Sequence, residues 1–437
     1  METLEGLKRT DYCGTLTAKD VGRTVTLCGW VQRQRDLGSL IFIDLRDRTG
    51  IVQLAFDENT DKAVFDKAFS ARSEYVLAAV GKVRERSAKN TEIATGEIEV
   101  EVTELRILGK SETPPFEIVP NCQTAETTRL KYRYLDLRRP DLQKNILLRH
   151  KITKITRDYF DENGFIEIET PMLIKSTPEG ARDYLVPARK HPGKFYALPQ
   201  APQQFKQLLM TSGFDRYFQI APCFRDEDAR GDRSPGEFYQ LDMEMAFAAQ
   251  DDVFAVIEDV LPPIFAKFGK YNIASEAPFR RIAYNDALET YGSDKPDLRI
   301  DLVLQDMTEL VKGSEFAPFA EGNVVKAVVV PSCELTRKQI DKLCADVEVQ
   351  SGSKPYWFKV EADGTLAGGV AKFMQPHAEA VVKALDLKPG CFVGVAAGKR
   401  TAAIKTAGVL RNKLGALVPG HMDKERYEFC WVVDFPM

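Results

Sequence analysis

Alternating apolar and polar positions indicate a series of short strands in the first 110 residues. Five segments carry this β-rich pattern: residues 24–32, 39–47, 51–56, 75–84 and 97–105. Between the third and fourth segments, residues 61–72 place apolar side chains on one helical face, namely Val64, Phe65, Ala68 and Phe69. Five strands with a helix after the third is the element order of an OB-fold, a small barrel that often binds single-stranded nucleic acid.

A domain boundary is expected after these strands, because residues 111–120 contain three prolines, which interrupt regular structure. The next segment, residues 129–149, is basic with interleaved tyrosines. It contains Arg129, Lys131, Arg133, Arg138, Arg139, Lys144 and Arg149, together with Asp136, Asp141, Tyr132 and Tyr134. Such a segment suits contact with a phosphate backbone, and the solvated face of an amphipathic helix explains the same composition equally well.

The remaining pattern predicts two further domains. Residues 146–164 read as an amphipathic helix, and residues 165–173 begin a strand. The apolar side of the helix consists of Ile146, Ile152, Ile155, Tyr159 and Phe160. Antiparallel strands are expected at 216–227 and 237–247. From about residue 286 the chain mixes helical and strand-like segments without clustered polar groups, which indicates a separate insertion.

Length and composition describe a folded protein of about three domains, with 437 residues, 44% of them hydrophobic and 28% charged. The formal net charge is −4, so any nucleic-acid contact must come from local basic patches. The eight cysteines include no CxxC pair, which favours reduced thiols over a metal knuckle. The N-terminal residues lack the apolar stretch of a signal peptide, and no apolar run approaches the roughly 18 residues of a spanning helix. We therefore expect a cytoplasmic protein with no membrane partner.

The densest cluster of polar side chains lies between residues 179 and 244. It comprises Glu179, Arg182, Asp183, Gln203, Lys206, Arg225, Asp226, Glu227, Asp242 and Glu244. In this region Arg225 can hold a phosphate with its forked guanidinium, Glu227 can accept a hydrogen bond from an adenine amino group, and Phe238 can stack on a base. These are the parts of a nucleoside triphosphate site, although an Arg-x-Glu on a strand is more often a surface ion pair.

Several unusual peptides resemble those of one family. They are GFIEIETPML, TPEGARDYLV, APQQFKQLLM, FDRYFQIAPCFRDEDARGDRSPGEFYQLDMEM and YGSDKPDLR. In this order they resemble the motifs of bacterial aspartyl-tRNA synthetases, which are class II aminoacyl-tRNA synthetases, from about residue 10 to residue 437. The fold implied is α+β multidomain. Its parts are an OB-fold anticodon-binding domain (1–110), a linker or hinge (111–145), an antiparallel-sheet catalytic domain (146–285), an inserted α/β, GAD-like domain (286–421) and the start of the returning catalytic segment (422–437).

The resemblance implies an aspartate–tRNA ligase, a homodimer that activates L-aspartate with ATP and Mg²⁺ to aspartyl-adenylate and transfers the aspartyl group to the 3′ end of tRNA(Asp). Motif 1, GFIEIETPML, would place Pro171 at the dimer interface. In motif 2, Arg225 would be the catalytic residue, bridging the aspartate carboxylate and the α-phosphate. The other implied ATP contacts are Asp226, Glu227, Ser234 and Phe238. The implied aspartate contacts are Glu179, Gln203 and Asp242 around the ammonium and Lys206 at the side-chain carboxylate, with Glu244 as the implied metal ligand.

The predicted barrel would bind the anticodon. The implied contacts are Arg33, Arg35, Leu37, Phe42 and Gln53, with Phe42 stacking on an anticodon base. From the residues alone, Phe42 is better explained as a barrel core residue. A histidine commonly stands at the place of Leu37 in relatives that accept both tRNA(Asp) and tRNA(Asn), so Leu37 favours an enzyme that discriminates between them.

The sequence departs from the family pattern in three places. Ala201 stands where relatives often have Ser, and Gly236 lengthens the motif 2 turn by one residue, which leaves Ser234 as a candidate ATP contact. After WVVDFPM the family continues with a histidine-containing loop, a glycine-rich strand and motif 3, so we expect this chain to be inactive alone. Three alternatives stay open: a non-discriminating aspartate–tRNA(Asp/Asn) ligase, a tRNA-binding fragment only, and a synthetase for asparagine or lysine. Lys206 together with Asp242 argues against the last.

Overall fold

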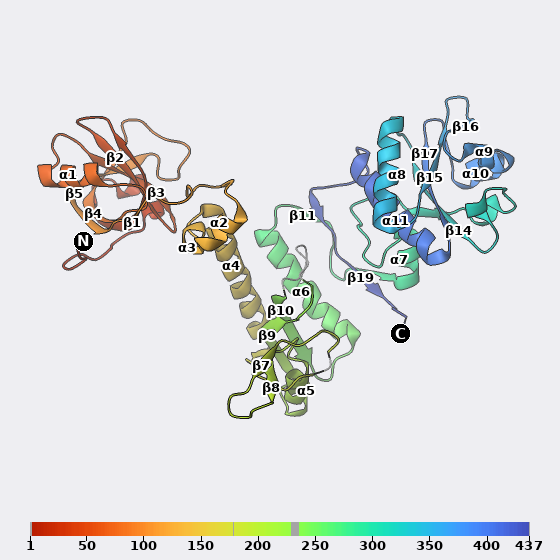
Figure 1. The fold of residues 1–437 in the computed structure, drawn as a ribbon, viewed down its shortest axis with the longest axis horizontal. Helices are drawn as coiled ribbons and strands as arrows, with labels where there is room; N and C mark the ends of the chain where they lie inside the picture. Colours follow the sequence, from red (N-terminus) through yellow and green to blue (C-terminus); the bar gives the residue numbers. More distant parts are fainter. Residues whose placement is uncertain (1, 178, 229–235, 437) are drawn as a thin grey trace. The chain divides into compact units, whose positions relative to one another are not determined.

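The computed structural model describes residues 2–177, 179–228 and 236–436. The chain divides into two compact units, Met1–Thr153 and Lys154–Met437 (Figure 1). Each unit has hydrophobic cores of its own. Within the described ranges, no helix is both long and apolar enough to cross a membrane.

The first unit is built around a closed five-stranded barrel with the strand order β1-β2-β3-β5-β4. Its elements are β1 (Thr24–Asp36), β2 (Ile41–Asp47), β3 (Gly50–Phe56), α1 (Lys62–Ser70), β4 (Val76–Glu85) and β5 (Ile98–Gly109), preceded by 3-10 turns at Cys13–Thr15 and Ala18–Asp20. Strands β3 and β5 run parallel, and the other neighbours run antiparallel. The predicted OB-fold, with its helix after the third strand, is confirmed.

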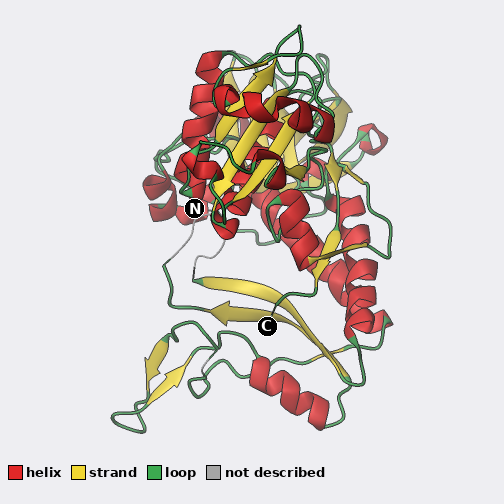
Figure 2. Cartoon of the chain, turned by 90° about the vertical axis from the view of Figure 1, so that its right-hand side faces the viewer, coloured by secondary structure: helices red, strands yellow, loops and turns green. Residues whose placement is uncertain are grey.

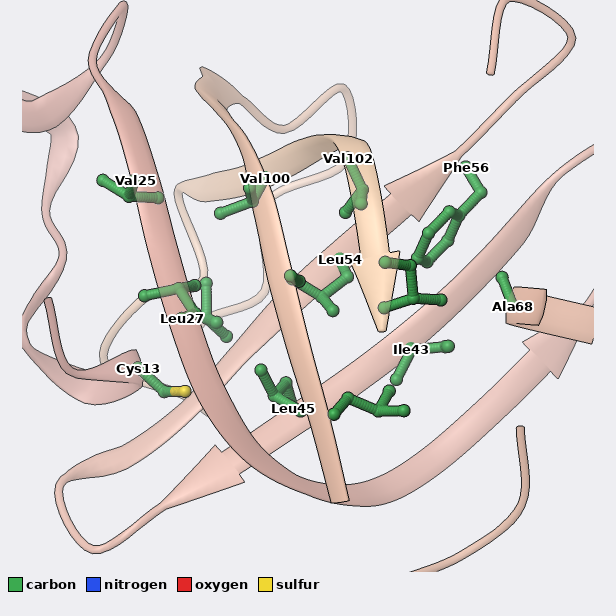
Figure 3. Close-up of a cluster of buried hydrophobic side chains, with 14 of the residues drawn as sticks. Cys13, Val25, Leu27, Ile43, Leu45, Leu54, Phe56, Ala68, Val100 and Val102 are labelled. Carbon is green, nitrogen blue, oxygen red and sulfur yellow. The ribbon is translucent and has the colours of Figure 1, made fainter. Parts of the chain in front are cut away.

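Apolar side chains fill the barrel because they occupy alternate positions along much of each strand. On β2, Ile41, Ile43 and Leu45 are fully buried. Figure 3 shows Ile43 and Leu45 in the same cluster as Leu27 and Leu54, which come from β1 and β3. The residues between them on β2 therefore point outward.

Helix α1 packs against this core with a narrower stripe than its sequence pattern suggests. Ala68 is buried, and Val64 and Phe65 pack against the core cluster. Asp61 caps the helix, because its side chain accepts a hydrogen bond from the backbone N–H of Val64. Phe69, on the same predicted apolar face, is 53% exposed, so this face extends beyond the part of the helix that contacts the core.

Three helices follow the barrel: α2 (Glu126–Lys131), α3 (Arg133–Asp136) and α4 (Pro140–Glu162). Helix α4 begins six residues before the predicted helix, with Pro140 in its first turn, where a missing N–H costs nothing. It spans the division between the two units. At the start of the predicted apolar side Ile146 is 54% exposed, whereas Phe160 near its end is fully buried.

The second unit begins with a three-stranded sheet of order β10-β9-β6. Its elements are β6 (Ile166–Glu167), β7 (Leu185–Pro187), β8 (Phe195–Ala197), α5 (Gln203–Thr211), β9 (Arg216–Phe224), β10 (Glu237–Met245), α6 (Gln250–Phe268), β11 (Asn272–Ile273) and β12 (Arg280–Ala283). The antiparallel pair predicted at 216–227 and 237–247 is confirmed as β9 and β10. The strand predicted from residue 165 is only two residues long, and Ile166 is 48% exposed.

A second sheet of five strands follows, with the order β13-β14-β17-β15-β16. The elements are α7 (Tyr284–Tyr291), β13 (Leu304–Asp306), β14 (Val324–Val330), α8 (Arg337–Ser351), β15 (Tyr356–Val360), β16 (Leu366–Ala367), α9 (Ala371–Met374), α10 (Ala378–Ala384), β17 (Phe392–Gly398) and α11 (Arg400–Leu417), with 3-10 turns at Glu309–Val311, Ala317–Phe319 and Gln375–His377. Helices α8 and α11 contribute to one core and α9 and α10 to another, on opposite faces of the sheet (Figure 2). Both faces are therefore covered, which explains the nearly continuous apolar run of β14.

The last strands return to the part of the chain that precedes this sheet. Strands β18 (Arg426–Tyr427) and β19 (Cys430–Val433) pair parallel with β11 and β12. Trp431 stacks on Phe254 of α6 at 4.0 Å and donates a hydrogen bond to Glu258 at 2.7 Å. The segments on either side of residues 284–425 thus lie side by side, which is the connectivity of an insertion.

Candidate functional site

One face of the β9–β10 pair is polar and the other is apolar. In the antiparallel register Asp242 lies opposite Gln219, and Glu244 lies opposite Tyr217, so these four side chains share a face. The alternate residue Phe218 points into the core beneath the sheet. The period of two along both strands therefore separates a polar surface from the core.

Helix α5 brings a cation to this polar face. Lys206 Nζ lies 2.9 Å from Asp242 Oδ1 and 3.2 Å from Glu244 Oε2. Burial alone would lower the pKa of Lys206, but its hydrogen bonds and charge interactions with the two carboxylates outweigh burial and raise the pKa above its usual value. The lysine is therefore protonated at neutral pH.

Asp242 keeps one free acceptor. It is 9% exposed, and its Oδ2 is buried with no hydrogen-bond partner among the residues that the structure describes. An unsatisfied buried acceptor costs about 1–3 kcal/mol, so this atom favours a ligand that donates hydrogen bonds, such as an ammonium. Gln203 is the first residue of α5 and lies one turn before Lys206, on the same side of the helix.

Arg225 follows β9 and lies beside an aromatic ring. Its guanidinium carbon is 5.1 Å from the centre of the Phe238 ring, and its backbone N–H donates to Gly236 O at 2.8 Å. Its Nε is buried without an acceptor in the described part of the chain. A forked cation with an unused donor beside an aromatic face suits a phosphate and a planar base.

A loop before α5 is fixed against the turn after β9. Arg182 Nε donates to Asp226 O at 2.8 Å, and the Asp226 N–H donates to Arg182 O at 2.9 Å. The side chains of Asp226 and Glu227 are exposed. Burial is the main cause that raises the pKa of Cys223 to about 11, and the charge of Glu179 contributes to it. The Glu179 side chain itself accepts a hydrogen bond from the Thr177 hydroxyl at 3.3 Å.

Ser234 and Glu244 complete the set of predicted ATP and metal contacts. Ser234 lies outside the described residues. Glu244 pairs with Lys206, and the described ranges contain no group of three metal-ligating side chains. Lys206 therefore supplies both Asp242 and Glu244 with a cation from within the chain, and Glu244 as a metal ligand stays a prediction.

Three buried polar residues of the site are absent from the sequence-based prediction. Gln200 is 1% exposed and donates to Ala181 O at 2.9 Å and to Asp183 Oδ1 at 2.6 Å, which holds the loop in place. Tyr217 donates to Gln219 Oε1 at 2.9 Å. The alternation along residues 216–224 could have placed Tyr217 and Gln219 on the polar face once the strand register was known.

The residues predicted to read the anticodon lie on the first unit. Phe42 is half-buried and alternates with the inward-facing Ile41 and Ile43, so its interpretation as a core residue is wrong. The Arg35 guanidinium lies 5.5 Å from the centre of the Phe42 ring and donates to Gln53 Oε1 at 2.8 Å. The structure therefore brings Arg35, Phe42 and Gln53 together on the outer face of the barrel.

The other two predicted residues of this face are more exposed. Arg33 is exposed and lies opposite Asp44 in the β1–β2 register. Asp44 pairs with Arg35 at 3.0 Å. Leu37 is 67% exposed in the loop between β1 and β2, at the end of the same face.

Several cations of the basic segment at 129–149 are held in ion pairs within the first unit. Asp136 is fully buried and pairs with three arginines of this segment: Arg129, Arg133 and Arg139. Arg138 pairs with Glu74 of the barrel at 2.7 Å. These four guanidiniums stabilise the fold, which leaves fewer cations for a phosphate backbone than the composition suggests.

Two family models match the chain. Residues 25–108 match the OB-fold nucleic acid binding domain, and residues 125–437 match the tRNA synthetases class II (D, K and N). The second match covers more than two thirds of the sequence. The chain belongs to the class II tRNA synthetases. In this synthetase an N-terminal OB-fold domain precedes a class II catalytic domain, and the polar face of β9–β10 belongs to the latter.

Curated relatives of this synthetase are longer than the chain. Aspartate–tRNA ligase from Ruminiclostridium cellulolyticum is 48% identical over 448 residues, covering 100% of this chain and 74% of the relative. Aspartate–tRNA(Asp/Asn) ligase from a Thermoanaerobacter species is 47% identical over 443 residues, with the same coverage.

Solved synthetase structures share the fold. Asparaginyl-tRNA synthetase from Pyrococcus horikoshii matches with a TM-score of 0.57 and 19% identity, covering 92% of this chain and 95% of that one. Aspartyl tRNA synthetase from Entamoeba histolytica matches with a TM-score of 0.54 and 17% identity, covering 93% and 91%. At these identities the likeness shows the fold alone.

Proposed function

We propose that this synthetase is an aspartate–tRNA ligase. The α-carboxylate of L-aspartate attacks the α-phosphorus of ATP and pyrophosphate leaves, which forms aspartyl-adenylate. A ribose hydroxyl at the 3′ end of tRNA(Asp) then attacks the carbonyl carbon and AMP leaves. The observation that carries the proposal is the partly buried trio of Lys206, Asp242 and Glu244, which offers charges for both ends of an aspartate.

The trio has groups left for a zwitterionic amino acid with a second carboxylate. The free Oδ2 of Asp242 supports contact with the substrate ammonium. The Lys206 ammonium has three donors, two of which are taken by Asp242 and Glu244, so one remains for the substrate's side-chain carboxylate. Asparagine in the same place would present an amide to this lysine, which costs on the order of 2–5 kcal/mol in a desolvated site, or about 30-fold to several thousand-fold in selectivity.

Arg225 and Phe238 are the residues proposed to hold ATP. A guanidinium at the α-phosphate neutralises the negative charge that builds up during in-line displacement. In a preorganised site the guanidinium is already in place, so no free energy is spent on moving it. The Arg225–Phe238 contact and the hydrogen bonds that fix Asp226 and Arg182 support such a fixed site. Magnesium enters this proposal only as the counterion of the ATP substrate.

The outer face of the barrel is proposed to bind the anticodon of tRNA(Asp). Phe42 provides a ring for stacking, and Arg35 and Gln53 provide polar groups beside it. Leu37, exposed in the adjacent loop, is proposed to favour tRNA(Asp) over tRNA(Asn). Measuring the affinities of the wild-type chain and Leu37→His for tRNA(Asp) and tRNA(Asn) transcripts tests this proposal. Wild type should bind tRNA(Asp) more tightly, and Leu37→His should reduce the difference between the two affinities. Equal affinities in wild type would contradict the proposal.

Assembly and location are also proposals. Ile166, Met172 and Leu173 around Pro171 are exposed apolar side chains, which supports a homodimer through motif 1. All eight cysteines are free, which supports a reducing compartment such as the cytoplasm. Sedimentation of wild type and Leu173→Asp tests the dimer, since a charge in the interface should yield monomers.

Binding of a non-hydrolysable aspartyl-adenylate analogue, measured by calorimetry, tests the amino-acid site. We expect wild type to bind it and to bind the asparaginyl counterpart at least 30-fold more weakly. Lys206→Met should abolish the preference, whereas Lys270→Met, at an exposed lysine of the same unit, should keep it. A chain that binds tRNA but neither analogue would be a tRNA-binding fragment only, which would contradict the proposed ligase.

A further inference from the structure

The β7–β8 hairpin carries a basic tip to which the proposed reaction gives no role. The 31 residues between Asp183 and Asp215 contain no acidic side chain. With 64 acidic residues in 437, a segment of this length would contain about four or five by chance. The hairpin lies within this acid-free segment, so its cations have no nearby carboxylate in sequence.

The cations are concentrated at the turn of the hairpin. Arg189, Lys190 and Lys194 are exposed and form no ion pair with the residues that the structure describes. The turn itself is hydrogen-bonded, because the Ala188 N–H donates to Lys194 O at 3.0 Å and the Lys194 N–H donates to His191 O at 3.0 Å. An ordered turn therefore presents three unpaired charges to solvent.

An apolar surface lies next to these charges. In the hairpin register Pro187 lies opposite Phe195 and Leu185 lies opposite Ala197, so these residues share one face. Leu185 and Phe195 are each 57% exposed. Single-stranded nucleic acid is bound by surfaces on which cations contact the backbone phosphates and a nearby aromatic ring stacks on a base.

The base of the hairpin borders the proposed ATP site. The Leu198 N–H donates to Tyr184 O at 3.0 Å at the open end of the hairpin. The Phe224 N–H donates to Pro199 O at 2.9 Å, immediately before Arg225 in the chain. Figure 1 shows β7 and β8 in the same part of the second unit as β9 and α5. A strand bound along the hairpin would thus end near the reacting groups.

We propose that the hairpin tip binds the single-stranded 3′ end of the tRNA, with Arg189, Lys190 and Lys194 at its phosphates and Phe195 stacked on a base. The inference rests on the proposed function, which supplies this ligand. A second copy of the chain is the competing occupant of the apolar face. In a twofold-symmetric dimer through this tip, the three cations of one subunit would lie against the same three cations of the other. The residues between Asp183 and Asp215 include no carboxylate to offset this repulsion, so the charge favours an anionic partner.

Salt-dependent binding of a tRNA(Asp) transcript tests the cations. In the triple variant R189A/K190A/K194A, affinity should fall and the slope of log affinity against log salt should become shallower by about 2, which corresponds to three phosphate contacts on a single strand. The matched control K338A/K354A/K383A removes the same charge from exposed lysines of the insertion and should keep the slope. A transcript that lacks its single-stranded 3′ end should bind wild type and the tip variant equally.

A second variant tests the ring. Phe195→Ala should weaken binding of the intact transcript about 5-fold to 150-fold without changing the salt slope. Unchanged binding of the aspartyl-adenylate analogue shows that both variants are folded. If wild type binds tRNA and the R189A/K190A/K194A variant keeps the wild-type slope of log affinity against log salt, the inference fails while the proposed function stands. If wild type binds no tRNA, both fail, and a changed sedimentation coefficient of either variant would assign the surface to a subunit interface instead.

Discussion

Glu74 forms a buried ion cluster with two arginines of the first unit. Both of its carboxylate oxygens accept from Arg46 Nη2 at 2.8 Å, and Oε2 also accepts from Arg138 Nη1 at 2.7 Å. Glu74 is 3% exposed and Arg46 is 4% exposed. The Arg138 guanidinium also lies 4.9 Å from the centre of the Trp30 ring. The cluster therefore joins the segment after the barrel to β1, β2 and the loop before β4.

Glu74→Gln removes the only carboxylate of this cluster and leaves two guanidiniums facing a neutral amide. Breaking a buried pair by removing one partner costs about 3–5 kcal/mol. Glutamine keeps one acceptor oxygen, so we expect the lower end, a loss of about 3 kcal/mol in the free energy of unfolding of the first unit. With an m-value of about 1–3 kcal/mol per molar in urea, the midpoint should fall by at least about 1 M.

Urea unfolding followed by tryptophan fluorescence measures this loss. Trp30 is in the first unit, and the chain has two other tryptophans, Trp357 and Trp431, in the second. Replacing both of these by Phe leaves Trp30 as the reporter of the first unit in the full chain. The comparison is then made between this background and the same background with Glu74→Gln.

Glu97→Gln is the matched control, because it makes the same chemical change at an exposed ion pair. Glu97 lies 3.2 Å from Lys89, and both side chains are about 60% exposed. Such a pair is worth about 0–1 kcal/mol, so the midpoint should hardly move. If Glu74→Gln shifts the midpoint no more than Glu97→Gln, the buried cluster does not stabilise the first unit and the reasoning is refuted.

Three further predictions concern other parts of the chain. Phe42→Leu should weaken tRNA binding by about 5-fold to 150-fold in fluorescence anisotropy, with an unchanged urea midpoint, and an unchanged affinity would remove Phe42 from the anticodon surface. Iodoacetamide at pH 7 should alkylate Cys122 before Cys223, as measured by peptide mass spectrometry. Hydrogen bonding to Thr124 lowers the pKa of the Cys122 thiol, whereas burial raises the pKa of Cys223 to about 11. Alkylation of Cys223 first would contradict this prediction. Gly292→Ala should destabilise the insertion by about 1–3 kcal/mol or more, as measured by hydrogen exchange. The φ of Gly292 is 73°, and a Cβ there would lie 2.4 Å from a backbone atom of α11. Unchanged protection of the insertion's amides would show that alanine causes no strain at this position.

The barrel is the part that its sequence predicts best. Half-buried antiparallel strands alternate with period two, and Ile41, Ile43 and Leu45 show this period without interruption. The strand at Ile166 is much shorter than its alternation suggests, because pairing depends on a neighbouring strand and only Ile166–Glu167 has one among the described residues. Local pattern therefore predicts which residues are suited to a strand but not how far the strand is paired.

The candidate site shows the same limit at the level of side chains. The residue types of Lys206 and Asp242 indicate the chemistry, but their contact joins residues 36 positions apart and depends on how α5 packs against β10. Composition likewise cannot show that Asp136 and Glu74 are buried among arginines, so the basic segment after the barrel looks freer than it is. Long-range packing decides which charges stay available to a ligand.

The preference of the amino-acid site tests the central claim most directly. The measurement is calorimetric titration of the wild-type chain with matched non-hydrolysable aspartyl-, asparaginyl- and lysyl-adenylate analogues. We predict that the aspartyl analogue binds most tightly, by about 30-fold to several thousand-fold over the asparaginyl one, because Lys206 has a donor left for a carboxylate. Equal affinities, or tighter binding of the asparaginyl or lysyl analogue, would contradict the assignment of this synthetase to aspartate.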